Sequence, residues 1–294
     1  MAEVATSTTS EQLLVVVDPV ARRSDGESVR IAKDVLGAGA GMKLCLPDGP
    51  EEFARALARR GARRPVVVGD DRALLRAVSV LHRQRELAAC GLSLVPVGGA
   101  LSLARSLGVP TGTVAAARAV LDGVERRMDL MVDDSDGVVL GALRIPPLSP
   151  SPGGAGEREP VADAEDAAGR PWLRTCQSLV RTLVPASRPA RPVSPPEPGP
   201  SRLRVEVDGE TLVDLNQPVE AVSVAPSASG VAAVEVRPVS VGAEASPLLA
   251  EGRTVTVSGA HFRYRADTQV SGPVRTRTWV VREGAWSLTV PAGA

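Results

Sequence analysis

The first half of the chain alternates short apolar runs with helical patterns. The runs at residues 13–17 and 65–68 are continuous, which is typical of parallel strands buried on both faces. Between such runs, apolar side chains recur every three or four residues, as on one face of a helix. Strands are expected at residues 13–17, 42–46, 65–68, 92–96, 128–132 and 138–143, and short helices at 101–107 and 114–121. This order predicts an α/β domain with a parallel, Rossmann-like sheet and right-handed crossovers.

Three longer helices are expected between the first four strands, two of them with boundary signals. Ser24 can cap the first helix, and Gly37 can close it. Asp48 and Pro50 begin the second, which would end at Gly61. The third carries its apolar stripe over residues 74–81. Each helix can therefore cover the sheet with one apolar face.

The last third of the chain has a period of two. Apolar and charged side chains alternate over residues 203–207, and Asp208-Gly209 is a hairpin-turn signal. Further strands are expected at residues 219–224, 231–236, 254–258, 276–282 and 285–290. This pattern predicts an antiparallel β-sandwich, or a closely related barrel, over residues 201–292.

Composition separates these two domains and sets the start of the first. Residues 146–200 are rich in Pro and Gly and predict a linker, with one amphipathic helix expected at 172–183. Residues 1–12 are polar and predict a disordered tail, so the α/β domain is expected over 13–145. Neither a signal-peptide pattern nor an apolar run of ~20 residues is found. We therefore expect a cytoplasmic protein, with peripheral contact at the inner membrane face left open.

Charge and cysteine content narrow the classes of partner. The chain has 34 basic and 34 acidic residues, so its formal net charge is zero. Proteins that neutralise nucleic-acid phosphates usually carry a basic excess, so no nucleic-acid partner is expected. Cys45, Cys90 and Cys176 are far apart and form no C-x-x-C pair. Neither a disulfide framework nor a metal site is therefore predicted. The sequence does not indicate an oligomeric state.

Residues 66–78 lie where a phosphate-binding loop would join a strand to a helix. Such loops use several glycines so that backbone N–H groups can approach the anion. Here Gly69 is the only glycine, and Asp70 and Asp71 place negative charge where phosphate needs donors. Arg72 could contact a phosphate. Asp71 has two interpretations, a carboxylate linked to Mg²⁺ or the N-cap of the following helix.

Two segments resemble the diacylglycerol-kinase-like lipid kinases of the NAD kinase/diacylglycerol kinase superfamily. Residues 66–78 are similar to the region of that family's G-G-D-G-T loop, and residues 96–110 to its P-x-G-T-x-N-D-x-A-R-x-L-G-x-P motif. The second segment matches at Pro96, Gly98, Ala104, Arg105, Leu107, Gly108 and Pro110. The resemblance covers residues 13–143 well and 201–292 loosely. It implies an α/β nucleotide domain followed by a lipid-side β-sandwich, with ATP and Mg²⁺ as cofactors.

The same resemblance implies the candidate site residues. The cofactor-binding candidates are Gly69, Asp71, Arg72, Gly98, Gly99 and Arg105. Arg105 is either a phosphate contact or an ordinary surface arginine. The catalytic candidate is Asp267, in the segment 266–269 that lies where the family has D-G-E; a residue that only occupies a turn is the other interpretation. Gln269 occupies the position of that family's proton acceptor.

Three departures from the family pattern coincide. Asp70, Arg72 and Ala73 replace Gly, Gly and Thr in the first loop, and Leu101 and Ser102 replace Asn and Asp in the second. The amide of Gln269 cannot act as a base at neutral pH. In addition to these three, the family's acidic metal segment has no clear match near residues 242–249, where Glu244 is the only acid.

These departures favour a lipid-kinase-like protein with weak or lost activity, serving as a nucleotide- or lipid-binding or regulatory module. An alternative is an active ATP-dependent kinase that phosphorylates a diacylglycerol-like or sphingoid hydroxyl. A third interpretation is an interaction protein with an empty cleft.

One further segment combines aromatic and basic residues. In the stretch 261–265, Phe262 and Tyr264 would share one face of a strand, and Arg263 and Arg265 the other. An ordinary half-buried strand is the favoured interpretation. Contact with anionic lipid is the alternative.

Overall fold

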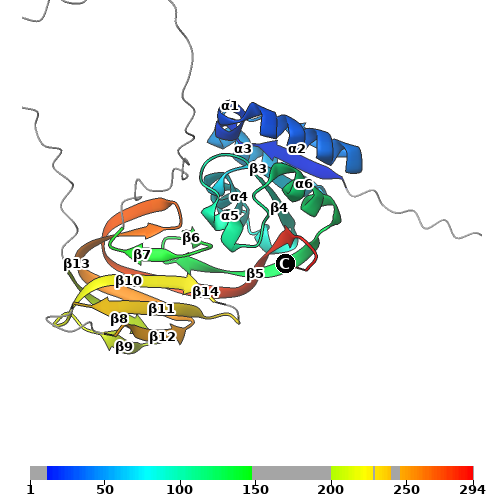
Figure 1. The fold of residues 1–294 in the computed structure, drawn as a ribbon. Helices are drawn as coiled ribbons and strands as arrows, with labels where there is room; N and C mark the ends of the chain where they lie inside the picture. The colour runs from blue at the N-terminus through cyan, green and yellow to red at the C-terminus, as the bar shows by residue number, and fades with distance from the viewer. Residues whose placement is uncertain (1–11, 148–199, 228, 240–245, 294) are drawn as a thin grey trace, which may run out of the picture. The chain divides into compact units, whose positions relative to one another are not determined.

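The computed structural model describes residues 12–147, 200–227, 229–239 and 246–293. The predictions for the N-terminal tail, most of the linker, the helix at 172–183, Cys176 and Glu244 lie outside the described residues. Within them, an N-terminal α/β part is followed by a strand-rich antiparallel part, as the sequence predicts (Figure 1).

Four short strands at the centre of the α/β part pair in parallel. They are β1 (Leu13–Val17), β2 (Met42–Cys45), β3 (Arg64–Gly69) and β4 (Gly91–Pro96). β1 lies between β2 and β3, and β4 pairs with β3. The carboxyl ends of β3 and β4 are therefore neighbours, and the two loops singled out by the sequence begin there.

Helices cover both faces of these strands. They are α1 (Pro19–Ser24), α2 (Gly26–Gly39), α3 (Pro50–Ala58), α4 (Asp71–Arg83), the 3₁₀ turn η1 (Leu87–Ala89), α5 (Ser102–Ser106) and α6 (Thr113–Asp122). One core contains buried residues of α2 and α6, and the other contains those of α3 and α4. Alternate side chains of β1 enter the two cores, which explains its unbroken apolar run.

The boundary predictions for the first helices are partly wrong. Asp25, not Ser24, caps α2, because its side chain accepts a hydrogen bond from the Ser28 N–H at 3.0 Å. Ser24 instead ends α1, a helix that was not predicted, and α2 continues past Gly37 to Gly39.

The strands of the strand-rich part pair with one another in antiparallel fashion. Its strands are β5 (Val124–Asp133), β6 (Val138–Val139), β7 (Leu143–Ile145), β8 (Ser201–Val207), β9 (Glu210–Val213), β10 (Pro218–Pro226), β11 (Ala232–Pro238), β12 (Leu248–Gly252), β13 (Thr254–Ala266) and β14 (Gln269–Val290). Asp208 and Gly209 both have positive φ in the β8–β9 turn, as the hairpin signal predicts.

The C-terminal strand returns to the α/β part. β14 pairs with β5 over residues 279–290, and near its end it also pairs in parallel with β4 (Figure 1). Trp286, Leu288 and Val290 share the core of α3 and α4. The buried Ser93 hydroxyl donates to Thr289 Oγ1 at 2.8 Å, across β4 and β14. The two parts are thus joined by a continuous ladder and a common core.

Candidate functional site

The two loops that resemble family motifs meet at the carboxyl ends of β3 and β4. Gly69 is buried, and a Cβ there would lie 2.6 Å from the Cβ of Ala73 and 2.9 Å from that of Asp18. Gly98 has φ +122°, and a Cβ there would lie 3.4 Å from the Cβ of Asp70. Gly69 therefore permits a close contact within the chain, whereas Gly98 is favoured by its positive φ. Gly99 is exposed and has no such constraint.

The backbone N–H groups at the start of α4 are all bonded within the chain. The carboxylate of Asp70 accepts from the N–H of Arg72 at 3.0 Å and from that of Ala73 at 3.1 Å. The Asp71 N–H donates to the carbonyl of Ala100, and the Leu74 N–H to the carbonyl of Asp70. Asp70 is therefore the N-cap of α4. In this conformation, none of the four N–H groups over residues 71–74 is free for an anion.

Asp71 caps the next helix and not its own. Its side chain is fully buried and accepts from the N–H groups of Leu103 and Ala104, both at 2.9 Å. The hydroxyl of Ser102 also donates to it at 3.3 Å. Asp71 thus closes the N-terminus of α5, and the α4-cap interpretation is wrong, because that role belongs to Asp70. Arg105, near the end of α5, is exposed.

Asp267 lies in the tight turn between β13 and β14. Its φ of +50° is tolerated in a hairpin turn, and its carboxylate accepts from the N–H groups of Leu140, Gly141 and Ala142 at 2.7–3.0 Å. Burial raises the pKa of Asp267, the three N–H bonds oppose that rise, and the charge of Asp71 adds to it. The two acids are therefore electrostatic neighbours, although neither lines the cavity described next.

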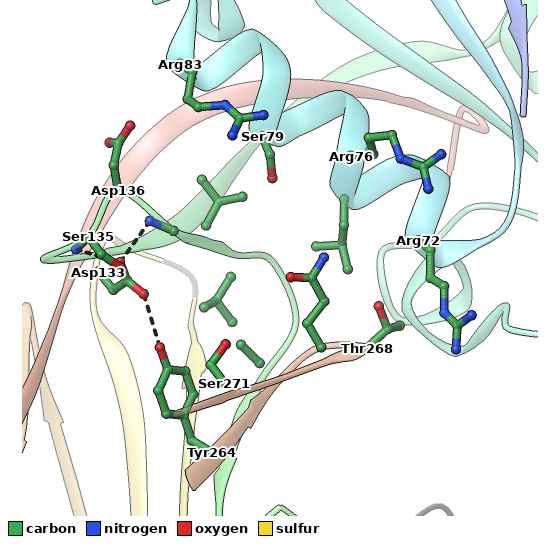
Figure 2. A pocket seen from close by; sticks show the side chains of 16 residues that line it. Arg72, Arg76, Ser79, Arg83, Asp133, Ser135, Asp136, Tyr264, Thr268 and Ser271 are labelled. Carbon is green, nitrogen blue, oxygen red and sulfur yellow. Dashed lines mark hydrogen bonds between the residues drawn. The ribbon is translucent and has the colours of Figure 1, made fainter. Parts of the chain in front are cut away.

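A cavity of about 510 Å³ lies between α4 and the strands of the second part. Figure 2 shows Arg72, Arg76 and Arg83 on α4, with Tyr264 and Thr268 on strand-side segments of the lining. Arg72 and Gln269 are the residues of the sequence-derived site that line this cavity; the other candidates lie outside its lining. The structure therefore divides the predicted site into two parts. One is the pair of loops, where the N–H groups at the start of α4 are bonded within the chain, and the other is the cavity, which is lined by Arg72 and Gln269.

Arginines dominate the α4 wall of the cavity. Arg76 is paired with Asp18, and its guanidinium lies 5.5 Å from the centre of the Phe53 ring. Within the described part of the chain, neither Arg72 nor Arg83 forms an ion pair. These two guanidinium groups are therefore the cations of this wall that remain available to an anionic ligand.

The strand wall includes a hydrogen-bonded group that sequence reasoning missed. Burial opposes ionisation of Asp133, but hydrogen bonds from Ser135 and Gly137, with the charge of Arg277, hold its pKa below the ordinary value. The Tyr264 hydroxyl donates to Asp133 at 3.3 Å (Figure 2). The D-D-S-D-G run at 133–137 was the available sequence signal, because such runs favour turns.

Gln269 lies on this wall, where the family resemblance implies a proton acceptor. It is exposed and closes the hairpin opposite Ala266. Its amide carries no titratable proton, and the nearby Asp267 carboxylate is held by three backbone donors.

The described residues show neither a metal-binding cluster nor a membrane-spanning helix. No group of three His, Cys, Asp or Glu side chains there could hold a metal ion. No helix in the same ranges is both long enough and apolar enough to cross a bilayer.

Comparison with known proteins identifies the fold. No protein-family model and no curated protein matches the sequence. A solved structure described as "a putative diacylglycerol kinase" from Bacillus anthracis str. Sterne is 15% identical, with a TM-score of 0.67, and covers 98% of this chain and 100% of its own. A second, similarly described, is 14% identical with a TM-score of 0.68, covering 96% and 98%.

A third structure, of a diacylglycerol kinase from the same organism, is 13% identical with a TM-score of 0.63, and again covers 96% and 98%. At this level of identity, such similarity defines the fold. The chain therefore has the fold of these diacylglycerol kinases, an α/β part followed by an antiparallel strand-rich part.

Proposed function

We propose that this chain is a diacylglycerol- or lipid-kinase-like protein with weak or lost kinase activity, which acts as a nucleotide- or lipid-binding or regulatory module. One observation carries the proposal. The backbone donors at the start of α4 are taken up by the carboxylate of Asp70 and by carbonyls of Asp70 and Ala100.

This observation bears on catalysis because phosphoryl transfer depends on positioning and on charge stabilisation. A phosphate loop positions its nucleotide through free N–H groups and a favourable helix N-terminus. Here a carboxylate occupies that position, so a triphosphate would have to displace a negative charge. The residues present therefore do not fit the phosphates of ATP in the manner of a glycine-rich loop.

The position of the expected proton acceptor supports the same proposal. The amide of Gln269 stands at the position that the family resemblance assigns to this role, and Asp267 is bonded to the 140–142 backbone. General-base catalysis typically contributes 10²–10⁴-fold to a rate. A chain without a free base and without free loop amides would retain little kinase activity.

The cavity supports a remaining role in binding. Arg72 and Arg83 lack ion-pair partners among the described residues, and the volume of about 510 Å³ suits a small anionic ligand. Guanidinium groups bind phosphate and carboxylate by paired hydrogen bonds. We therefore propose that an anion binds to these arginines in place of the loop amides.

A thermal-shift titration with ATP and ADP, each with and without Mg²⁺, tests the binding role. We expect a nucleotide shift that is independent of Mg²⁺ and falls in an Arg72→Gln variant. An Arg59→Gln variant is the matched control, because Arg59 is exposed and is not among the residues that line this cavity. A shift that requires Mg²⁺ and survives Arg72→Gln would contradict the proposal, and no shift with any nucleotide would favour an empty cleft.

The alternative, an active kinase, rests on Asp267. Burial and the charge of Asp71 raise the pKa of this carboxylate, which increases its proton affinity. Phosphorylated lipid product, formed from ATP and lost in an Asp267→Asn variant, would favour this alternative.

A further inference from the structure

The outer face of β7, β13 and β14 carries an unusual row of arginines. Phe262 and Tyr264 are buried, so Arg263 and Arg265 lie on the opposite, outer face of β13. On β7, Leu143 and Ile145 are buried on either side of the exposed Arg144. The outer face of this region is therefore basic while its inner face belongs to the core.

The strand register brings like charges together. Arg265 lies directly opposite Arg144 in the antiparallel pair of β13 and β7. Side chains at such positions share a face and lie close together, and like charges there are destabilising. A protein that keeps this pair accepts a cost in stability, which indicates an anionic partner for the face.

No carboxylate within the described residues pairs with these groups. Arg144, Arg263 and Arg265 have no ion pair there, and the Nε of Arg265 is buried without a hydrogen-bond partner. Among the described residues, the Arg275 Nε donates only to the Nε2 of His261, at 3.4 Å. We call Arg144, Arg263, Arg265 and Arg275 the basic strip.

The nearest acid along the same cross-strand row is already engaged. Ser223 lies opposite Arg144, and Glu235 lies opposite Ser223, two strands away from Arg144. The carboxylate of Glu235 accepts from Arg237 at 2.7 Å. The basic strip is therefore not neutralised from this side.

An exposed apolar residue completes the surface. Val270 lies opposite Arg265 on β14 and is 50% exposed. Its neighbours Gln269 and Ser271 instead line the cavity, because successive residues of a strand point to opposite faces. The hairpin thus presents arginines with an apolar side chain on one face and a wall of the cavity on the other.

We propose that the basic strip, with Val270, docks the protein on an anionic phospholipid bilayer. Arginines beside an exposed apolar side chain suit a surface with negative headgroups above an apolar layer. The chain as a whole has no net charge, so the attraction must be local. Docking would place the wall of the cavity that the hairpin forms at the membrane. The docking itself does not depend on the proposed function; only ligand binding in the cavity at the membrane rests on it.

The expected loss of membrane binding follows from the number of positive charges removed. Each basic residue near an anionic membrane raises the partition coefficient about fivefold, and the effect decays within a Debye length. Removing Arg144 and Arg265 should therefore reduce binding about 25-fold. Because the same substitutions remove a like-charge pair, they should leave the melting temperature unchanged or raise it.

Vesicle co-sedimentation with the full chain, without nucleotide, tests the proposal. The vesicles are phosphatidylcholine alone or phosphatidylcholine with phosphatidylserine, and the variant is Arg144→Gln/Arg265→Gln. The control, Arg59→Gln/Arg118→Gln, removes the same charge from exposed positions on or beside α3 and α6. We expect salt-sensitive binding only to the phosphatidylserine vesicles, lost in the first variant and kept in the control.

Equal binding to both vesicle types, or an equal loss in the two variants, would overturn the proposal. Tighter binding to single-stranded RNA than to phosphatidylserine vesicles would also overturn it, in favour of a nucleic acid on this face. A Val270→Ser variant that binds several-fold more weakly would support insertion of the hairpin. Since no nucleotide is present, failure here leaves the proposed function untouched, and failure of the nucleotide test leaves the docking result untouched.

Discussion

Replacing Asp70 by Gly tests whether the cap on α4 is what keeps phosphate away. The substitution removes the acceptor of two N–H groups, those of Arg72 at 3.0 Å and Ala73 at 3.1 Å. The Ala73 N–H also donates to the Asp70 carbonyl, at 3.0 Å, and keeps this bond in the variant. It therefore becomes only partly available to donate to an anion. Hydrogen bonds to a charged group contribute about 1.5–3 kcal/mol each. We therefore expect a net gain of about 2 kcal/mol, or roughly 30-fold tighter anion binding.

The stability cost of this change should be small, a few tenths of a kcal/mol, because Gly is tolerated at an N-cap. Isothermal titration with tripolyphosphate, without Mg²⁺, measures the gain. Asp70→Asn is the matched control, since Asn keeps the cap and removes only the charge. We expect it to gain about fivefold, from the charge alone. Equal affinity in the wild type and Asp70→Gly, or equal gains in the two variants, would refute the reasoning.

Three further predictions concern the scaffold around the site. Gly69→Ala should destabilise the protein by about 1–3 kcal/mol, since its Cβ would overlap that of Ala73, and an unchanged melting temperature would contradict this. Arg76→Gln should cost about 2–4 kcal/mol in urea denaturation, because it leaves the buried Asp18 carboxylate unpaired; a cost below about 0.5 kcal/mol would contradict that role. The lowered pKa of Asp133 means that its stabilisation is present above the unfolded-state pKa and is lost as pH falls through the folded-state value. Unfolding free energy should therefore fall below about pH 4, and less steeply in Asp133→Asn; equal acid slopes would exclude this contribution.

The sequence predicts the helices and strands better than it predicts which residues contact one another. The strands β1, β3 and β4 and the stripe of α4 follow from local periodicity, which is set by which faces are buried. Helix α1 was not predicted, although the sequence contains a signal for its start. Asp18 followed by Pro19 is a strand end, but it is also an N-cap followed by a proline at the first helical position.

The site was less predictable because its contacts are long-range. A run of two aspartates does not reveal which one caps α4, and the partners of Asp71 lie more than 30 residues away in α5. The final strand gives a similar example. Alternation predicts that Trp286 and Leu288 share a face, but nothing local indicates that this face joins the core beneath α4. Strand register and tertiary packing determine both the contacts of Asp71 and the core that Trp286 and Leu288 join.

The most direct test of the central claim is product formation. The full chain is incubated with labelled ATP, Mg²⁺ and vesicles that contain diacylglycerol and phosphatidylserine, and labelled phosphatidic acid is measured. We predict little or no product above the protein-free control, because the Asp70 carboxylate is bonded to the N–H groups of Arg72 and Ala73 and because Gln269 stands where the family resemblance implies a base. Phosphatidic acid formed in proportion to protein concentration, and abolished by Asp267→Asn, would contradict the account.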